Sequence, residues 1–136
     1  DFIRNYADRY HHAKEEDILF VRLGQVGFPT QAGPVAVMLF EHDQSRGFIS
    51  KLENANERYA VGDKKAIPEI IENARVYAAL LRQHIQKEDM VLYPMAEKAL
   101  GDAGVERMQP DFDRAEQDKS GTEAKYLAIL KQMENG

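Results

Sequence analysis

The sequence has 136 residues, a formal net charge of −5 and no cysteine. The length suits one domain over residues 1–136, and the acidic balance argues against nucleic acid or an anionic membrane as the main partner. The lack of cysteine excludes disulfides, iron–sulfur clusters and thiolate zinc sites, so any metal must be held by histidine and carboxylate. No apolar run approaches the roughly 20 residues that span a bilayer, and no secretory leader is visible, so we expect a cytoplasmic protein.

Apolar residues recur with a helical period of about 100° per residue in three long stretches. The pattern predicts helices over residues 2–23, 35–59 and 64–100, with a possible kink at Pro94 and one or two shorter helices after Pro110. The segment GQVGFPTQAGP predicts the first loop and VGD the second. No run reads as a strand, so we expect an all-α, up-and-down helical bundle. The chain begins without methionine, already inside a helical pattern, and we expect the native protein to begin earlier.

Two histidines and two glutamates crowd the first predicted helix in the stretch HHAKEEDILF. Residues four apart lie one turn apart on the same helix face, so His12 and Glu16 point the same way. On a regular helix this pair falls inside the apolar arc. His11 and Glu15 fall outside it, and we expect His11 to be exposed or to lie behind the ligands.

The third predicted helix repeats the arrangement in HIQKEDMVLYP. His84 and Glu88 fall among apolar residues, whereas Asp89 lies at the edge of the arc. His42 falls on the inner face of the second helix, and Glu41 is expected to point outward. Three histidines and two carboxylates are therefore predicted to converge from three helices.

Buried carboxylates are normally paired or bound to metal, because burying one alone costs several kcal/mol. A lone His-x-x-x-Glu is usually a surface pair, and a purely structural bundle without metal is the simplest alternative. Two such pairs on inner faces, joined by a third histidine, favour a metal site instead. Imidazole with carboxylate suits iron, manganese or zinc. The sequence leaves open whether Arg46 contacts a ligand or solvent, and whether Tyr77 supports a ligand or fills the core.

Three motifs, HHAKEEDILF, EHDQSRG and LLRQHIQKEDMVLYPMAE, resemble in this order the bacterial hemerythrin-like, or HHE cation-binding, domain. The resemblance covers nearly the whole chain and implies a four-helix bundle around a non-heme di-iron centre. It implies two iron ions bridged by carboxylates and an oxo or hydroxo group, with manganese or zinc as substitutes. The implied metal ligands are His12, Glu16, His42, His84 and Glu88; no catalytic residue is assigned.

Two departures from the family qualify this expectation. The family has a preceding helix that carries a further histidine ligand, so we expect the domain to be N-terminally incomplete; a homodimer is one way to fill the gap. Oxygen-carrying hemerythrins place a second histidine one turn after His42, where this chain has Arg46. That difference favours reaction with a small ligand over reversible oxygen carriage.

The expected function is binding of dioxygen, peroxide or nitric oxide for sensing, storage or detoxification. Two alternatives stay open at this stage. One is a protein that stores iron or donates it for the repair of metal centres. The other is a peroxidase- or catalase-like di-iron enzyme, which turnover of peroxide would reveal.

Overall fold

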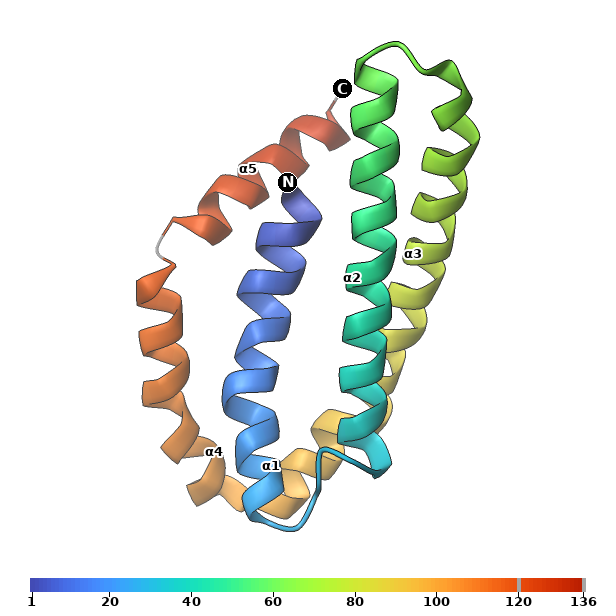
Figure 1. Cartoon of the computed structure of the whole chain (residues 1–136). Coiled ribbons are helices and arrows are strands. Elements are labelled where there is room, and N and C mark those ends of the chain that lie inside the picture. Colours follow the sequence, from blue (N-terminus) through green and yellow to red (C-terminus); the bar gives the residue numbers. More distant parts are fainter. Residues whose placement is uncertain (120, 136) are drawn as a thin grey trace. The chain divides into compact units, whose positions relative to one another are not determined.

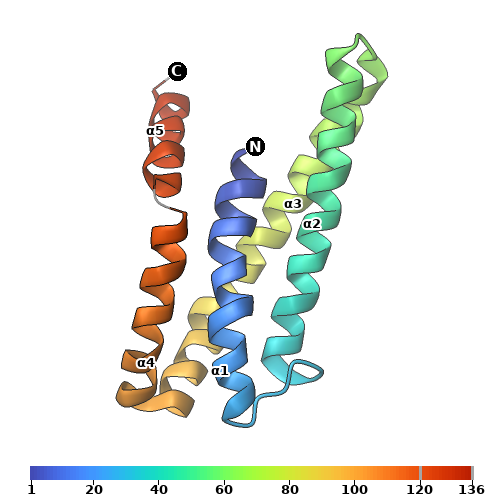
Figure 2. The ribbon, with the colours of Figure 1, turned by 60° about the vertical axis from the view of Figure 1, so that its left-hand side comes forward.

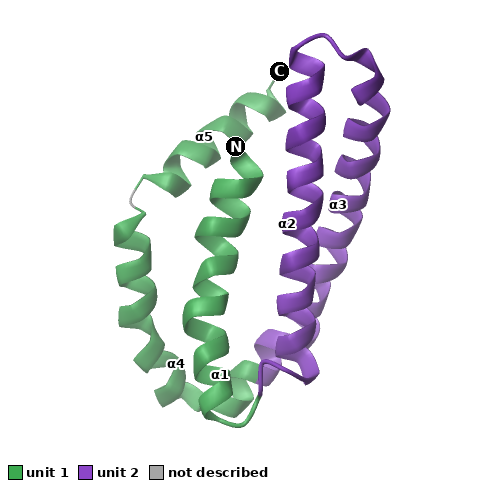
Figure 3. Cartoon of the chain, viewed as in Figure 1, with its two compact units in different colours: residues 1–28, 96–136 green, residues 29–95 purple. Residues whose placement is uncertain are grey.

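The computed structural model describes residues 1–119 and 121–135, and within these ranges it is helical and contains no strand. The prediction of an all-α fold is confirmed. The chain divides into two compact units, which Figure 3 distinguishes by colour. One unit combines residues 1–28 with residues 96–136, and the other comprises residues 29–95. Nothing among the described helices is long and apolar enough to cross a membrane.

An antiparallel helical hairpin forms the unit of residues 29–95. Helix α2 (Gly33–Ala60) and helix α3 (Ile67–Lys87) lie side by side in both Figure 1 and Figure 2. Each has a proline in its first turn, where the missing N–H costs no helical hydrogen bond. The predicted turn between them is confirmed. It includes Gly62, whose φ of 99° favours glycine, and it leads into a short 3-10 helix, η3 (Lys64–Ala66).

The third predicted helix continues without a loop but changes its hydrogen-bonding pattern. After α3 comes a π-helical segment, η4 (Glu88–Leu92), and then helix α4 (Tyr93–Asp118). Pro94 therefore lies in the first turn of α4, where proline is tolerated. The break falls at Gly101, whose φ of 65° and ψ of 173° are not helical. A shorter helix does follow Pro110, as expected, but the predicted break at that residue is wrong, because α4 runs through it.

The other unit joins the N-terminal segment to the end of the chain. Its first run consists of η1 (Ile3–His12), η2 (Glu15–Leu19) and α1 (Phe20–Gln25), of which η1 and η2 are π-helical. It packs against helix α5 (Thr122–Glu134) and is joined to α4 by ion pairs. Ion pairs connect these segments, and rings from both ends of the chain pack together. The contacts are Lys14–Glu116 at 3.0 Å, Arg22–Asp111 at 3.1 Å, and the rings of Phe2, Tyr6 and Tyr126.

Candidate metal centre

Two histidines and a glutamate converge inside the hairpin unit. His42 comes from the middle of α2, His84 from the last turn of α3, and Glu88 begins η4. All three are buried, and His42 has no exposed surface. Nε2 of His84 lies 2.7 Å from Oε1 of Glu88 and 3.1 Å from Nε2 of His42. Their ligand atoms all lie within 4.8 Å of one another, so the inward placement predicted for these three residues is confirmed.

This geometry suits a bound cation. Nδ1 of His84 lies 2.9 Å from a carboxylate oxygen of Glu41 and is placed to donate a hydrogen bond to it. In neutral imidazole the other nitrogen then carries a lone pair, which faces the Glu88 oxygen. A proton or a metal ion must lie between two such acceptors. A proton forms a good hydrogen bond between two of these side chains at a time, whereas a metal ion can be bound by His42, His84 and Glu88 together. Two ligands at right angles, each about 2.1 Å from one ion, are about 3 Å apart, close to the observed spacings.

Glu41 is buried at this site, so the prediction that it points outward is wrong. Its Oε2 contacts Nδ1 of His84, and its Oε1 accepts a hydrogen bond from Nζ of Lys87. Burial raises the pKa of the Glu41 carboxyl, but hydrogen bonds from Lys87 and His84 outweigh it, and the pKa lies below the ordinary value. Glu41 is therefore an anion that can only accept hydrogen bonds.

The N-terminal unit carries a second pair of buried ligand types, His12 and Glu15. Nδ1 of His12 lies 3.6 Å from Oδ1 of Asp8, a carboxylate one turn earlier. Glu15 is only 5 % exposed, and its Oε1 lies 3.6 Å from Nε2 of the exposed His11. The predicted inward placement of His12 and outward placement of His11 are confirmed.

The prediction that Glu16 rather than Glu15 lies on the inner face is wrong. Glu15 is buried, whereas Glu16 has intermediate exposure. The projection assumed a uniform α-helix, but the π-helical η1 precedes this pair, and the two glutamates themselves begin the π-helical η2. Hydrogen bonds in a π-helix run from residue i to i+5, so each residue turns the chain by less than in an α-helix. Over the first run, this smaller turn per residue places Glu15 instead of Glu16 on the buried face.

The two π-helical segments correspond to each other. Segment η2 begins at the buried Glu15 and ends at the buried Leu19, while η4 begins at the buried Glu88 and ends at the buried Leu92. Short π-helical insertions are rare and frequently mark functional sites. Aligning the two motifs on their leucines would have selected Glu15 from the sequence alone.

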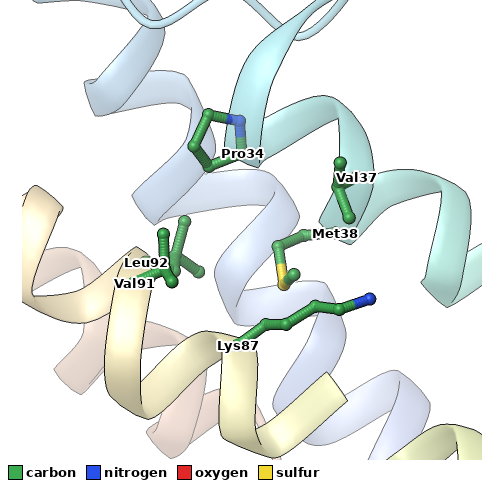
Figure 4. Close-up of a pocket in the computed structure, with 6 residues that line it drawn as sticks. All are labelled: Pro34, Val37, Met38, Lys87, Val91 and Leu92. Carbon is green, nitrogen blue, oxygen red and sulfur yellow. The ribbon is translucent and has the colours of Figure 1, made fainter. Parts of the chain in front are cut away.

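A pocket of about 250 Å³ opens beside the ligand cluster within the hairpin unit. Figure 4 shows its walls, with Met38 above the Lys87 side chain and the Val91–Leu92 pair to the left of both. Pro34 and Val37 complete a lining that is apolar except for Lys87. Met38 lies one turn before His42, and Leu92 one turn after Glu88. The pocket can therefore hold a small, uncharged molecule one helical turn from the ligands.

Three further residues from the sequence analysis have clear places. Tyr77 is buried on α3, two turns before His84. Asp89 is exposed, as expected for a flanking charge. Nη1 of Arg46 contacts Oδ1 of Asp43 at 3.2 Å, on an exposed part of α2.

Comparison with known proteins agrees with this geometry. The model of the hemerythrin HHE cation binding domain matches residues 1–96. Relatives include an uncharacterized protein of Mycobacterium bovis and two of Mycobacterium tuberculosis strains, each 23% identical over 128 residues. The match covers 94% of this chain and 49% of each relative, so the chain spans about half the length of the curated relatives it matches. No solved structure matches the chain.

Proposed function

This chain belongs to the hemerythrin HHE cation-binding family, and we propose from that premise that it is a non-heme di-iron protein that binds dioxygen or a related small ligand. The observation that carries the proposal is the buried convergence of His42, His84 and Glu88. The Glu88 oxygen lies 2.7 Å from Nε2 of His84, a contact that needs a proton or a metal ion between the two atoms.

The proposed metal ligands are His12, Glu15, His42, His84 and Glu88. Glu15 replaces Glu16 in the set because it is the buried glutamate of the first motif. Family membership supports combining the N-terminal pair with the hairpin cluster on one pair of ions. In such a centre the two glutamates would neutralise part of the metal charge, and the imidazoles would fill terminal positions.

Iron is the proposed metal because the resemblance to hemerythrins implies it, and the donor set of imidazoles and carboxylates without thiolate suits it. An iron pair supplies redox chemistry and an open position for a small ligand when it is bound. The chain's own residues would hold the ions in fixed geometry and shield them from bulk water. The apolar pocket beside Met38 and Leu92 supports an uncharged ligand such as dioxygen or nitric oxide.

The proposal is tested by loading the protein anaerobically with ferrous iron, exposing it to air, and measuring metal content and the visible spectrum. We expect about two irons per chain and near-ultraviolet bands that shift when azide is added. The His84→Ala variant should lose both signals while retaining its helical circular dichroism. A folded wild-type protein that binds no iron, or whose spectrum ignores azide, would contradict the proposal. Turnover of peroxide in the same sample would identify an enzyme rather than a carrier or sensor.

A further inference from the structure

Glu41 connects the ligand cluster to the edge of the hairpin. One of its carboxylate oxygens lies 2.9 Å from Nδ1 of His84, and the other accepts a hydrogen bond from Lys87. The Lys87 stem lines the apolar pocket, and 43% of its side chain is exposed. A chain of three residues thus runs from a solvent-accessible ammonium group to the nitrogen of His84 that faces away from Glu88.

The direction of each hydrogen bond follows from the donors. Lys87 can only donate, and the Glu41 carboxylate that pairs with it accepts through both oxygens. The proton shared with His84 therefore belongs to Nδ1, and in neutral imidazole the lone pair then lies on Nε2. That nitrogen is the one that faces both Glu88 and His42.

We propose that Glu41, held in place by Lys87, is a positioning residue that fixes His84 with Nε2 as its metal-binding nitrogen. This assignment rests on the proposed metal centre, because it concerns the presentation of one of its ligands. A carboxylate that accepts the second N–H of a ligating histidine fixes its tautomer and ring orientation and makes it a stronger donor. Loss of such a partner typically weakens metal affinity about 10–100-fold.

Lys87 has a separate part in this arrangement. Glu41 is buried, and its Oε1 contacts the ammonium group of Lys87, whose side chain lines the apolar pocket. Without the ammonium group, Oε1 of Glu41 would lose this hydrogen bond, and the carboxylate could turn toward other donors. That change would weaken its hold on His84. We therefore expect the Lys87→Met variant to share the defect of Glu41 variants in milder form.

The test uses zinc, which is diamagnetic, and measures two quantities in each variant. Zinc affinity is measured by competition with a chelator, and the ring nitrogens of His84 are followed by ¹⁵N NMR. In wild-type protein we expect a protonated Nδ1 and a zinc-bound Nε2. Glu41→Leu should weaken zinc binding about 10–100-fold and remove the single tautomer. Glu41→Gln keeps an acceptor oxygen and should restore much of both signals.

Matched controls separate positioning from stability. Glu57→Gln and Lys51→Met change exposed residues of α2 and should leave zinc affinity and the His84 spectrum unchanged. A purely structural ion pair would lower the unfolding temperature without changing the tautomer, and that result would overturn the assignment. Equal zinc affinity and an unchanged tautomer in folded Lys87→Met would also overturn it, even if Glu41→Leu does not fold. Failure of wild-type protein to bind zinc or iron would instead reject the proposed metal centre and this assignment with it.

Discussion

Nε2 of His84 lies 2.7 Å from Oε1 of Glu88, at the point where helix α3 passes into a π-helical segment. The pair links the last turn of one element to the first residue of the next, and both side chains are buried. With Nδ1 of His84 directed at Glu41, the contact with Glu88 needs a proton or a metal ion between the two atoms. The predictions below test whether a metal ion takes that place.

Replacing each of the two adjacent glutamates of the first motif by glutamine should have unequal effects on iron content. Glu15 is buried and Glu16 is partly exposed, so Glu15→Gln should lower iron content strongly, whereas Glu16→Gln should leave it near the wild-type value. The two variants remove the same charge from neighbouring positions. Metal analysis after identical loading makes the comparison, and greater loss in Glu16→Gln would restore the regular-helix interpretation.

The adjacent histidines give a second matched pair. His12 is buried beside Asp8, whereas His11 is exposed, so His12→Ala should lose iron and His11→Ala should keep it. Iron content and the azide-sensitive absorbance of both variants are the measurements. Loss confined to His11→Ala would mean that the wrong histidine has been assigned.

Removal of the metal should destabilise the fold. A ligand that binds only the native state stabilises it by about 2.7 kcal/mol when its free concentration is 100 times its dissociation constant. For a chain of this length such a loss should lower the unfolding temperature by on the order of 10 °C. Thermal unfolding before and after chelation, and after iron is restored, measures the effect. An unfolding temperature that does not change when the metal is removed would contradict a site formed by the folded state.

Filling the apolar pocket should slow the access of small ligands. Val91 lines the pocket and Met90 does not, although both are exposed residues of η4. Val91→Trp should therefore reduce the rate at which nitric oxide binds the ferrous protein, while Met90→Trp should not. Stopped-flow spectroscopy measures both rates. Equal rates in the two variants would show that ligands reach the metal by another route.

Acid should weaken the hairpin turn through Asp63. Hydrogen bonds from Arg58 lower the pKa of this carboxyl, and the backbone N–H of Lys65 adds to the effect against desolvation. A lowered folded-state pKa gives stability that is present above the ordinary value of about 3.9 and is lost as pH falls through the folded value. Asp63→Asn should therefore be less stable than wild type at pH 7, with the gap closing below about pH 4. Denaturant unfolding at pH 7 and below about pH 4 measures the difference in stability between the variant and the wild type. A difference that does not depend on pH would contradict the assignment.

Much of the fold follows directly from local sequence patterns. The turn at residues 61–63 and the two long helices that it joins are marked by glycine, proline and apolar periodicity. The break at Gly101 agrees with the predicted helix end at residue 100, but the continuation of the helix through Pro110 was not predicted, because proline usually ends a helix. The pairing of residues 101–118 with the first run depends on contacts between distant parts of the chain, such as Lys14 with Glu116. No local pattern encodes them.

The candidate site was predictable to the extent that helices are regular. His42, His84 and Glu88 follow from an α-helical projection, since the residues that precede them are α-helical. Glu15 was missed because π-helical segments shift the faces of the first run, and hydrophobic periodicity alone does not reveal them. Glu41 was missed for a different reason. Its burial depends on Lys87 and His84 from another helix, which spacing along its own helix cannot show.

The most direct test of the proposed di-iron centre is X-ray absorption spectroscopy of the iron-loaded protein. We predict a first shell of nitrogen and oxygen, outer-shell scattering from imidazole rings, and an iron–iron vector shorter than about 4 Å, as expected for a two-metal site. A spectrum without imidazole scattering, or one that fits a single isolated iron, would contradict the account.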